Sequence, residues 1–420
     1  MKQIAKKPEL LLPAGSFSAL KTAFLYGADA VYAGTPEMSL RAKSNFPIEE
    51  MQEAIKYAHS LGKKVYLALN VFSHNSDVEK LPSFVKTLKS LMPDGVIISD
   101  PGIFQYVKKE IPGMPLRVST QANICSWLTA DFWKNMGADL CVLAREVSFN
   151  EALEIRKKCS ALKLEIFVHG AMCISYSGRC LMSAFMAWRS ANSGACAHSC
   201  RWKYKSKMLL EEELRPGEYL ELYEDKHGSY VLNSKDLCLM PHLDKILAAG
   251  FDSLKIEGRT KSEYYAAQTA RVYRKAIDDY FLNPDLWKSD IYENELNTLQ
   301  NRGYTTGFFD GAAQAQAQDY NDTSSKSFWR NAGIVRENKK SSIVIELRHK
   351  LKKGDEIEIL SPFVFEPVKI VLNEIYDKIS GRITPEVSPG KPGQSVEIPL
   401  IYKDFSLFPE NTVVRIKLKI

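Results

Sequence analysis

The chain has 420 residues, of which 45% are hydrophobic and 25% are charged, and its formal net charge at pH 7 is +6. This length exceeds the size at which one hydrophobic core usually stops growing, so we expect two domains. No apolar run approaches the ~20 residues that a membrane-spanning helix needs, so we expect no membrane partner. The small positive charge is compatible with an RNA partner and equally with an ordinary basic surface.

Residues 1–7 lack the apolar stretch and the small-residue cleavage site of a secretory signal. We therefore expect a cytoplasmic protein. Because the cytosol keeps thiols reduced, the cysteines are expected to be metal ligands or free thiols rather than disulfides.

Short apolar, β-rich runs alternate with longer amphipathic stretches over the first two thirds of the chain. Strands are predicted at 9–12, 30–32, 64–71, 95–99, 116–119, 140–144, 164–168 and 252–257, and helices at 16–26, 48–60, 78–91 and 150–158. Gly27, Gly137 and Gly250 each end a helical pattern shortly before a strand, as a C-terminal cap does. This repeated unit predicts an α/β fold with a parallel sheet.

Eight strands are the number needed for a closed (β/α)8 TIM-like barrel. A doubly wound open sheet is the alternative, but no G-x-G-x-x-G follows the first strand. The interval between strands seven and eight is too long for one repeat, so residues 171–250 are predicted to be a cysteine-rich insertion. An insertion after strand seven lies at the C-terminal face, where barrel enzymes carry their chemistry.

A polar stretch at 311–326 indicates a domain boundary, which we place between 325 and 326. The catalytic domain is thus predicted to span 1–325 and a second domain 326–420. Beyond the boundary, strands are predicted at 342–347, 355–360, 368–375, 394–398 and 412–418. This pattern is typical of a small all-β barrel.

Charged side chains follow several of the predicted barrel strands. Arg145, His169, Glu257 and Arg259 all come at strand ends, where barrel enzymes place catalytic residues. The arginines could bind an anionic small molecule, and His169 or Glu257 could transfer a proton. The alternative is that Arg145–Glu146 and Glu257–Arg259 are ion pairs that tie loops together.

Five of the eight cysteines lie between residues 173 and 238: Cys173, Cys180, Cys196, Cys200 and Cys238. Zinc sites favour C-x2-4-C pairs, which this spacing matches poorly, whereas loops wrap iron–sulfur clusters with irregular spacing. We favour an iron–sulfur cluster, with zinc or free thiols as alternatives. A 4Fe-4S cluster needs four ligands, so one cysteine is spare, and we favour Cys196 over Cys200.

A basic, aromatic run follows the fourth of these cysteines. Arg201 and Lys203 could contact phosphate, and Trp202 could stack on an unpaired base. An exposed strand with alternating lysines is an equally good interpretation.

Five linked segments carry a resemblance to a known family. They are PELLLPAG at 8–15, GADAVYAG at 27–34, HGAMC at 169–173, YSGRC at 176–180 and KIEGRTK at 255–261. In this order they resemble peptidase family U32, the collagenase-like group, and within it the tRNA 5-hydroxyuridine hydroxylation proteins. The resemblance runs from about residue 8 to residue 310, with a β module after it.

The resemblance implies an enzyme that hydroxylates the wobble uridine of tRNA without oxygen, with prephenate as co-substrate. It also implies a 4Fe-4S cluster on Cys173, Cys180, Cys238 and either Cys196 or Cys200. The partners would be tRNA, a small anionic co-substrate and an electron donor. Two alternatives stay open. One is a collagenase-like peptidase, although neither H-E-x-x-H nor G-x-S-x-G occurs. The other is a non-catalytic, RNA-binding or cluster-carrying accessory protein.

Overall fold

The structure is a computed structural model that describes residues 6–35, 39, 47–173, 234–311, 327–400, 402 and 404–418. Between 174 and 233 it describes residues 175, 179–180, 183, 187, 196–197 and 199, and the backbone of four short strands. Two compact units are distinguished, one mainly of residues 32–260 and 301–326, the other of 9–31, 261–300 and 327–420. The predicted domain boundary at 325 and 326 stays a prediction.

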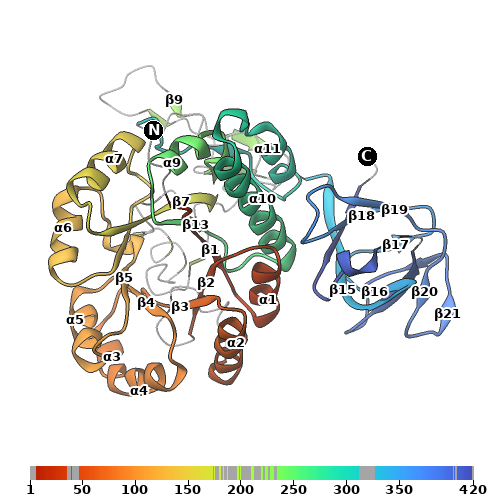
Figure 1. Cartoon of the computed structure of the whole chain (residues 1–420), viewed down its shortest axis with the longest axis horizontal. Helices are drawn as coiled ribbons and strands as arrows, with labels where there is room; N and C mark the ends of the chain where they lie inside the picture. Colours follow the sequence, from red (N-terminus) through yellow and green to blue (C-terminus); the bar gives the residue numbers. More distant parts are fainter. Residues whose placement is uncertain are drawn as a thin grey trace. The chain divides into compact units, whose positions relative to one another are not determined.

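Eight strands form a closed barrel, as predicted. They are β1 (Glu9–Pro13), β2 (Ala30–Gly34), β3 (Lys64–Leu69), β4 (Gly95–Ile98), β5 (Leu116–Val118), β6 (Leu140–Val142), β7 (Lys163–Ala171) and β13 (Ser253–Ile256). They follow one another in this order in the sheet, and β13 pairs with both β1 and β7, which closes the ring (Figure 1). The pairs from β3 to β7 are parallel, as is the pair of β7 and β13.

Helices lie outside the ring of strands (Figure 1). In the first unit they are α2 (Ile48–Ser60), α3 (Asn75–Val78), α4 (Leu81–Leu91), α5 (Pro101–Glu110), α6 (Trp127–Asn135), α7 (Phe149–Lys158) and α9 (Leu243–Ala248). Side chains cap the N-termini of α5, α6 and α7, and Ser148 and Glu151 form a capping box on α7. The helix predicted over 78–91 is confirmed as α4, which begins at Leu81 with Pro82 in its first turn, whereas Val78 ends the short α3. The backbone N–H groups in the first turn of a helix make no intrahelical hydrogen bond. Proline, which lacks this N–H, is therefore tolerated there.

The predicted cysteine-rich insertion also contributes to the sheet. Strand β12 (Asp236–Cys238) pairs antiparallel with β7 and parallel with β14 (Tyr304–Thr305). Strand β7 extends to Ala171, three residues beyond the predicted end at 168. This extension gives β12 its partner and sets Cys238 opposite His169.

The second unit contains α1 (Phe17–Leu25), α10 (Glu263–Leu282), α11 (Asp290–Leu296) and an eight-stranded sheet. The sheet's main strands are β15 (Trp329–Lys339), β16 (Ser342–Leu347), β18 (Glu356–Leu360), β19 (Val368–Val371), β23 (Ser395–Pro399) and β24 (Val413–Lys417). These strands pair antiparallel with one another, which confirms the predicted all-β C-terminal domain. Strand β15 was not predicted, because charged residues at both ends obscure its alternation of apolar and polar side chains.

None of the described helices is both long enough and apolar enough to cross a bilayer.

Candidate active site

Most of the predicted catalytic residues lie on β7 or directly after β13. The register of these two strands pairs Ser253 with Glu165 and Lys255 with Phe167, and alternate residues of a strand share one face. The register shifts between Lys255 and Ile256, so that Ile256 pairs with His169. Such an irregularity re-aims the following side chain, here that of Glu257, whose backbone N–H donates to the His169 carbonyl at 2.8 Å.

Gly170 allows this close approach of the two strands. It has φ +118°, and a Cβ atom there would lie 2.3 Å from the carbonyl oxygen of Glu257. A side chain at this position would therefore push β13 away from β7. The glycine in the HGAMC segment thus fixes the spacing of His169 and Glu257.

A buried charge cluster lies between the strands. Glu165 has no solvent exposure, and it accepts hydrogen bonds from Lys255 Nζ at 2.8 Å and from Arg117 Nη1 at 3.2 Å. The Ser253 hydroxyl donates to it as well, at 2.8 Å. Burial raises the pKa of Glu165, but the charges of Lys255 and Arg117 outweigh it, so the pKa lies below its usual 4.5. The carboxylate is therefore ionised at neutral pH.

The predicted site residues do not include this cluster. Yet its signal is present in the sequence, because Arg117, Glu165 and Lys255 each interrupt a predicted apolar strand. Barrel interiors are usually filled by layers of branched apolar residues, so a charge within such a strand needs a partner or a function.

Tyr32 on β2 links the cluster to Glu257. Its hydroxyl donates to Glu257 Oε2 at 2.9 Å, while its ring centroid lies 4.5 Å from Lys255 Nζ. His169 is only 1% exposed, and its ring centroid lies 5.3 Å from that of Tyr304. The predicted pair of His169 and Glu257 is thus brought together at the end of β7 and β13.

The two predicted arginines lie differently. Arg259 is buried; its guanidinium donates to the Ser39 hydroxyl and lies 5.9 Å from the Tyr32 ring centroid. Arg145 donates to the Ala171 carbonyl at 2.6 Å and lies 4.8 Å from the Phe167 ring centroid. Arg259 therefore belongs to the surroundings of Tyr32, and Arg145 fastens its loop to the end of β7.

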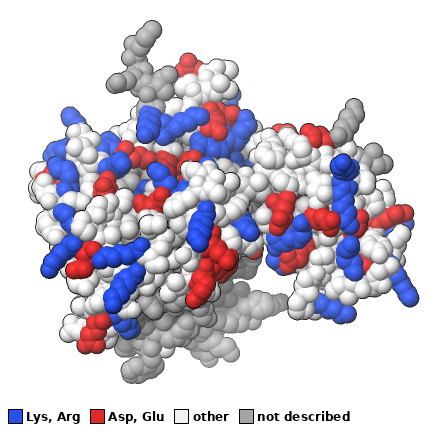
Figure 2. Space-filling model, turned by 60° about the horizontal axis from the view of Figure 1, so that its bottom comes forward, with Lys and Arg blue, Asp and Glu red and all other residues white. Residues whose placement is uncertain are grey.

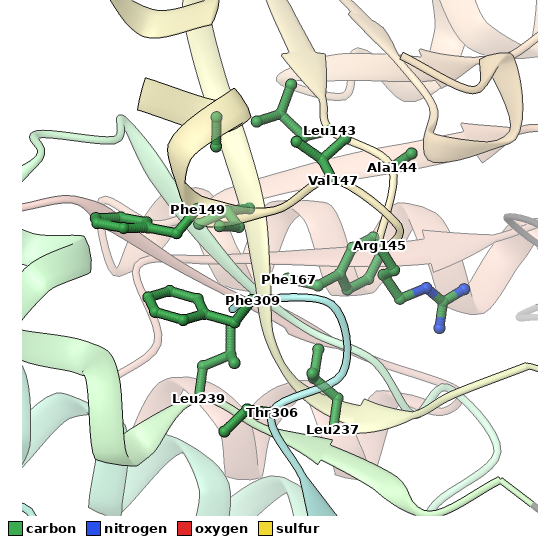
Figure 3. A pocket seen from close by; sticks show the side chains of 12 residues that line it. Leu143, Ala144, Arg145, Val147, Phe149, Phe167, Leu237, Leu239, Thr306 and Phe309 are labelled. Carbon is green, nitrogen blue, oxygen red and sulfur yellow. The ribbon is translucent and has the colours of Figure 1, made fainter. Parts of the chain in front are cut away.

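A narrow apolar pocket lies beside Arg145 (Figure 3). The Phe149 and Phe309 rings stack in it with their centroids 4.7 Å apart, and the guanidinium of Arg145 points away from them. Leu237 of β12 and Leu239, which follows this strand, also line the pocket. The side chains around this pocket thus pack strand β12 of the insertion against the barrel. Its lining does not include the buried charged residues Arg117, Glu165 and Lys255.

Two of the predicted cluster cysteines, Cys173 and Cys238, lie at the ends of β7 and β12. Cys180 and Cys238 are buried, Cys196 is half-buried and Cys173 is exposed, and all four are free thiols. Cys238 is opposite His169 in the sheet, and Cys173 follows β7 by two residues. Among the described residues, no three His, Cys, Asp or Glu side chains are placed to hold a metal ion. Cys200, Arg201, Trp202 and Lys203 lie outside the described residues.

On the face shown in Figure 2, lysine and arginine side chains are interspersed with aspartate and glutamate rather than gathered in one basic field. The predicted RNA-binding segment stays a prediction.

Comparisons with known proteins agree with the segments quoted above. The model of Peptidase family U32 matches residues 15–319, and that of the Peptidase family U32 C-terminal domain matches residues 329–412. A protein of Escherichia coli K12 named tRNA hydroxylation protein P is 40% identical over 397 residues, covering 85% of this chain and 86% of that protein. The tRNA hydroxylation protein P1 of Bacillus subtilis 168 is 38% identical, covering 86% of this chain and 85% of its own. The tRNA hydroxylation protein P of Helicobacter pylori 26695 is 45% identical, covering 71% of each chain.

Proposed function

The chain belongs to peptidase family U32, and from this premise we propose that it is a tRNA-modifying enzyme that hydroxylates a uridine of the anticodon. The relatives named as tRNA hydroxylation proteins support the substrate class, since they match this chain over most of its length. The observation that carries the proposal is the set of proton-holding and cationic side chains at the mouth of the barrel. The finer proposal is oxygen-independent conversion of the wobble uridine to 5-hydroxyuridine.

The charge of the site favours an anionic co-substrate. Arg117, Lys255 and Arg259 bring three positive charges, against two carboxylates at Glu165 and Glu257. This excess of positive charge in a buried setting attracts a small anion. We therefore propose prephenate, which carries carboxylates, as the co-substrate at this mouth.

His169, Tyr32 and Glu257 are the groups that we propose to hold or move protons. Glu257 accepts the Tyr32 hydroxyl proton in a hydrogen bond, so the carboxylate is oriented before any substrate binds. His169 is held beside it by the strand pairing. Either group could accept a proton from the bound substrate.

We propose that a 4Fe-4S cluster is held by Cys173, Cys180, Cys196 and Cys238, with Cys200 as the alternative to Cys196. The thiol chemistry and the placement of Cys173 and Cys238 around the end of β7 support this proposal. When bound, such a cluster supplies one-electron transfer beside the substrate.

Replacing Cys238 by alanine is expected to remove most of the iron from anaerobically purified protein, because a cluster with three thiolate ligands is poorly retained. Iron and sulfide content, together with the absorption band near ~400 nm that such clusters give, would measure the loss. Cys159→Ala is the matched control, since that buried thiol donates to the Trp127 carbonyl, between the end of α7 and the start of α6. Full iron content in Cys238→Ala would contradict the assignment.

The test of the activity itself is a tRNA assay with prephenate under anaerobic conditions, read out by mass spectrometry of the nucleosides. Glu257→Gln keeps the size of the side chain and removes its charge. We expect its kcat to fall about 100-fold or more, the usual contribution of a general acid or base, while tRNA binding is retained.

An unchanged rate in Glu257→Gln would instead favour a non-catalytic accessory protein. Glu154→Gln, on the exposed face of α7, is the control for the substitution. A parallel assay with gelatin tests the collagenase-like peptidase. If the protein is such a peptidase, it cleaves gelatin, and neither the Glu257→Gln substitution nor added tRNA changes the rate of cleavage.

A further inference from the structure

A buried acceptor without a donor lies at the end of β5. Gln121, in the single turn Thr120–Ala122 that follows this strand, is 9% exposed, and its side-chain carbonyl oxygen Oε1 has no hydrogen-bond partner among the residues that the structure describes. Buried polar atoms are nearly always paired, because an unpaired one loses its hydration without replacement. An unpaired acceptor at the C-terminal rim of a barrel therefore points to a ligand that supplies a donor.

Two other side chains adjoin this position. Arg179 Nη2 donates to the backbone carbonyl of Gln121 at 3.2 Å, and its guanidinium carbon lies 5.6 Å from the ring centroid of Phe72. Phe72 follows β3 and is half-buried, whereas Arg179 is exposed. The hydroxyl of the next residue, Ser73, is a second buried polar atom for which the described part of the chain offers no partner. The rim over β3 and β5 thus combines an aromatic face, a cation and unpaired hydrogen-bonding groups.

The chemistry of these groups selects the ligand. Gln121 Oε1 needs an N–H or O–H donor, which excludes a bare phosphate or carboxylate anion as its partner. The ring of Phe72 offers a stacking face, and Arg179 can contact a phosphate or stack on a base. A uridine nucleotide satisfies all three, because uracil presents the N3–H as a donor and a flat ring as a stacking surface.

We propose that Gln121, Phe72 and Arg179 form a subsite that receives the target base and selects uracil over cytosine. Enzymes that act on a base move it out of the base stack. They then recognise it by hydrogen bonds to its edge and by stacking on a side chain. Gln121 Oε1 accepts the N3–H of uracil, whereas the N3 of cytosine bears no proton and repels that oxygen. Arg179 immediately precedes Cys180, so the subsite adjoins a proposed cluster ligand. The inference rests on the proposed function and assigns the specificity of its base site.

Gln121→Leu tests the subsite in the full-length, cluster-loaded protein. We expect kcat/KM for a tRNA with the target uridine to fall about tenfold, the loss of one hydrogen bond to the substrate. Preference for uridine over cytidine at the target position is expected to fall as well. The melting temperature should stay equal or rise, because the variant removes an unpaired buried acceptor. A residue with a purely structural role would show the opposite, with a lower melting temperature and unchanged selectivity.

Gln105→Leu, an exposed glutamine on α5, is the matched control and should change none of these values. Gln121→Met serves in place of the leucine variant if the latter loses iron or folds poorly. Wild-type selectivity in a folded Gln121 variant would overturn the proposal.

Direct binding separates this proposal from the proposed activity. If the wild-type protein modifies no tRNA, the hydroxylase assignment fails, and the subsite is then judged by fluorescence anisotropy with single-stranded oligouridylate and oligocytidylate. Tighter binding of oligouridylate that Gln121→Leu abolishes supports the subsite, and equal binding of both oligonucleotides by both proteins overturns it.

Discussion

Replacing Glu165 by glutamine is expected to lower the free energy of unfolding by about 3–5 kcal/mol, the usual cost of removing one partner from a buried ion pair. The variant keeps the shape of the side chain but leaves the charges of Lys255 and Arg117 without their shared carboxylate. Both cations are almost fully buried, so water cannot replace it. Urea unfolding at pH 7, followed by circular dichroism under anaerobic conditions, measures the change.

Two further variants make this result specific. Glu154→Gln removes an exposed carboxylate that pairs with Lys158 at 2.8 Å, and we expect a change below about 0.5 kcal/mol. Lys255→Met in the Glu165→Gln background removes one of the stranded charges and should restore part of the stability. An unfolding midpoint of Glu165→Gln equal to that of the wild type would show that water or another anion enters the barrel.

The same substitution should also lower activity. Glu165 holds Lys255 at 2.8 Å, and Lys255 in turn lies 4.5 Å from the ring centroid of Tyr32, the donor to Glu257. Loss of the carboxylate frees Lys255 to shift, and Tyr32 and Glu257 lose their fixed placement. Glu165 is thus a positioning residue, and its variant should reduce kcat more than it raises KM for tRNA.

The barrel was predictable because its signals are local and repeated. Gly27, Gly137 and Gly250 each end a helix with positive φ, and each is followed within three residues by a strand. The strand ends also located His169 and Glu257 at one place, since parallel strands in a barrel present their carboxyl ends together. The hydrophobic periodicity and the capping residues are thus sufficient to predict the strands and helices that carry the site. No long-range contact has to be known for this.

The internal partners of the site were not predictable in the same way. Arg117, Glu165 and Lys255 lie in three strands separated by 48 and 90 residues from one another, and only the closure of the barrel shows that they meet. Strand β12 is three residues long, too short for any periodicity, and its pairing depends on the extension of β7. Gln121 follows the predicted strand 116–119, where barrel enzymes place functional residues, but only its burial and surroundings show that its acceptor is unpaired.

A second network of charges connects the C-terminal sheet with the helices of its own unit. Arg415 on β24 is 2% exposed, and its guanidinium donates to Glu358 Oε2 at 2.7 Å and to Glu295 at 3.1 and 3.2 Å. Arg271 on α10 also donates to Glu295, at 2.9 Å. Burial raises the pKa of Glu295, but the charges of Arg415 and Arg271 outweigh it and bring the pKa to about 2.

Arg415→Ala is therefore expected to destabilise the protein by about 3–5 kcal/mol, because Glu295 and Glu358 lose the cation that compensates their burial. Arg348→Ala is the matched control, since its pair with Glu346 is exposed and should contribute below about 1 kcal/mol. Urea unfolding of the full chain at pH 7 compares the two. Equal midpoints for both variants would contradict the assignment of a buried network.

The pH dependence of stability gives an independent test of the same network. The pKa of Glu295 is depressed in the folded state, so its contribution is fully present above its unfolded value of 4.5 and is lost as the pH falls from 4.5 toward 2. This contribution amounts to about 3 kcal/mol, at 1.36 kcal/mol per pKa unit. Arg415→Ala removes the largest charge that lowers this pKa, so its unfolding free energy should change less between pH 5 and pH 3 than that of the wild type. A pH profile parallel to the wild type would mean that Arg271 alone keeps Glu295 ionised, and Arg271→Ala in the same background would then flatten it.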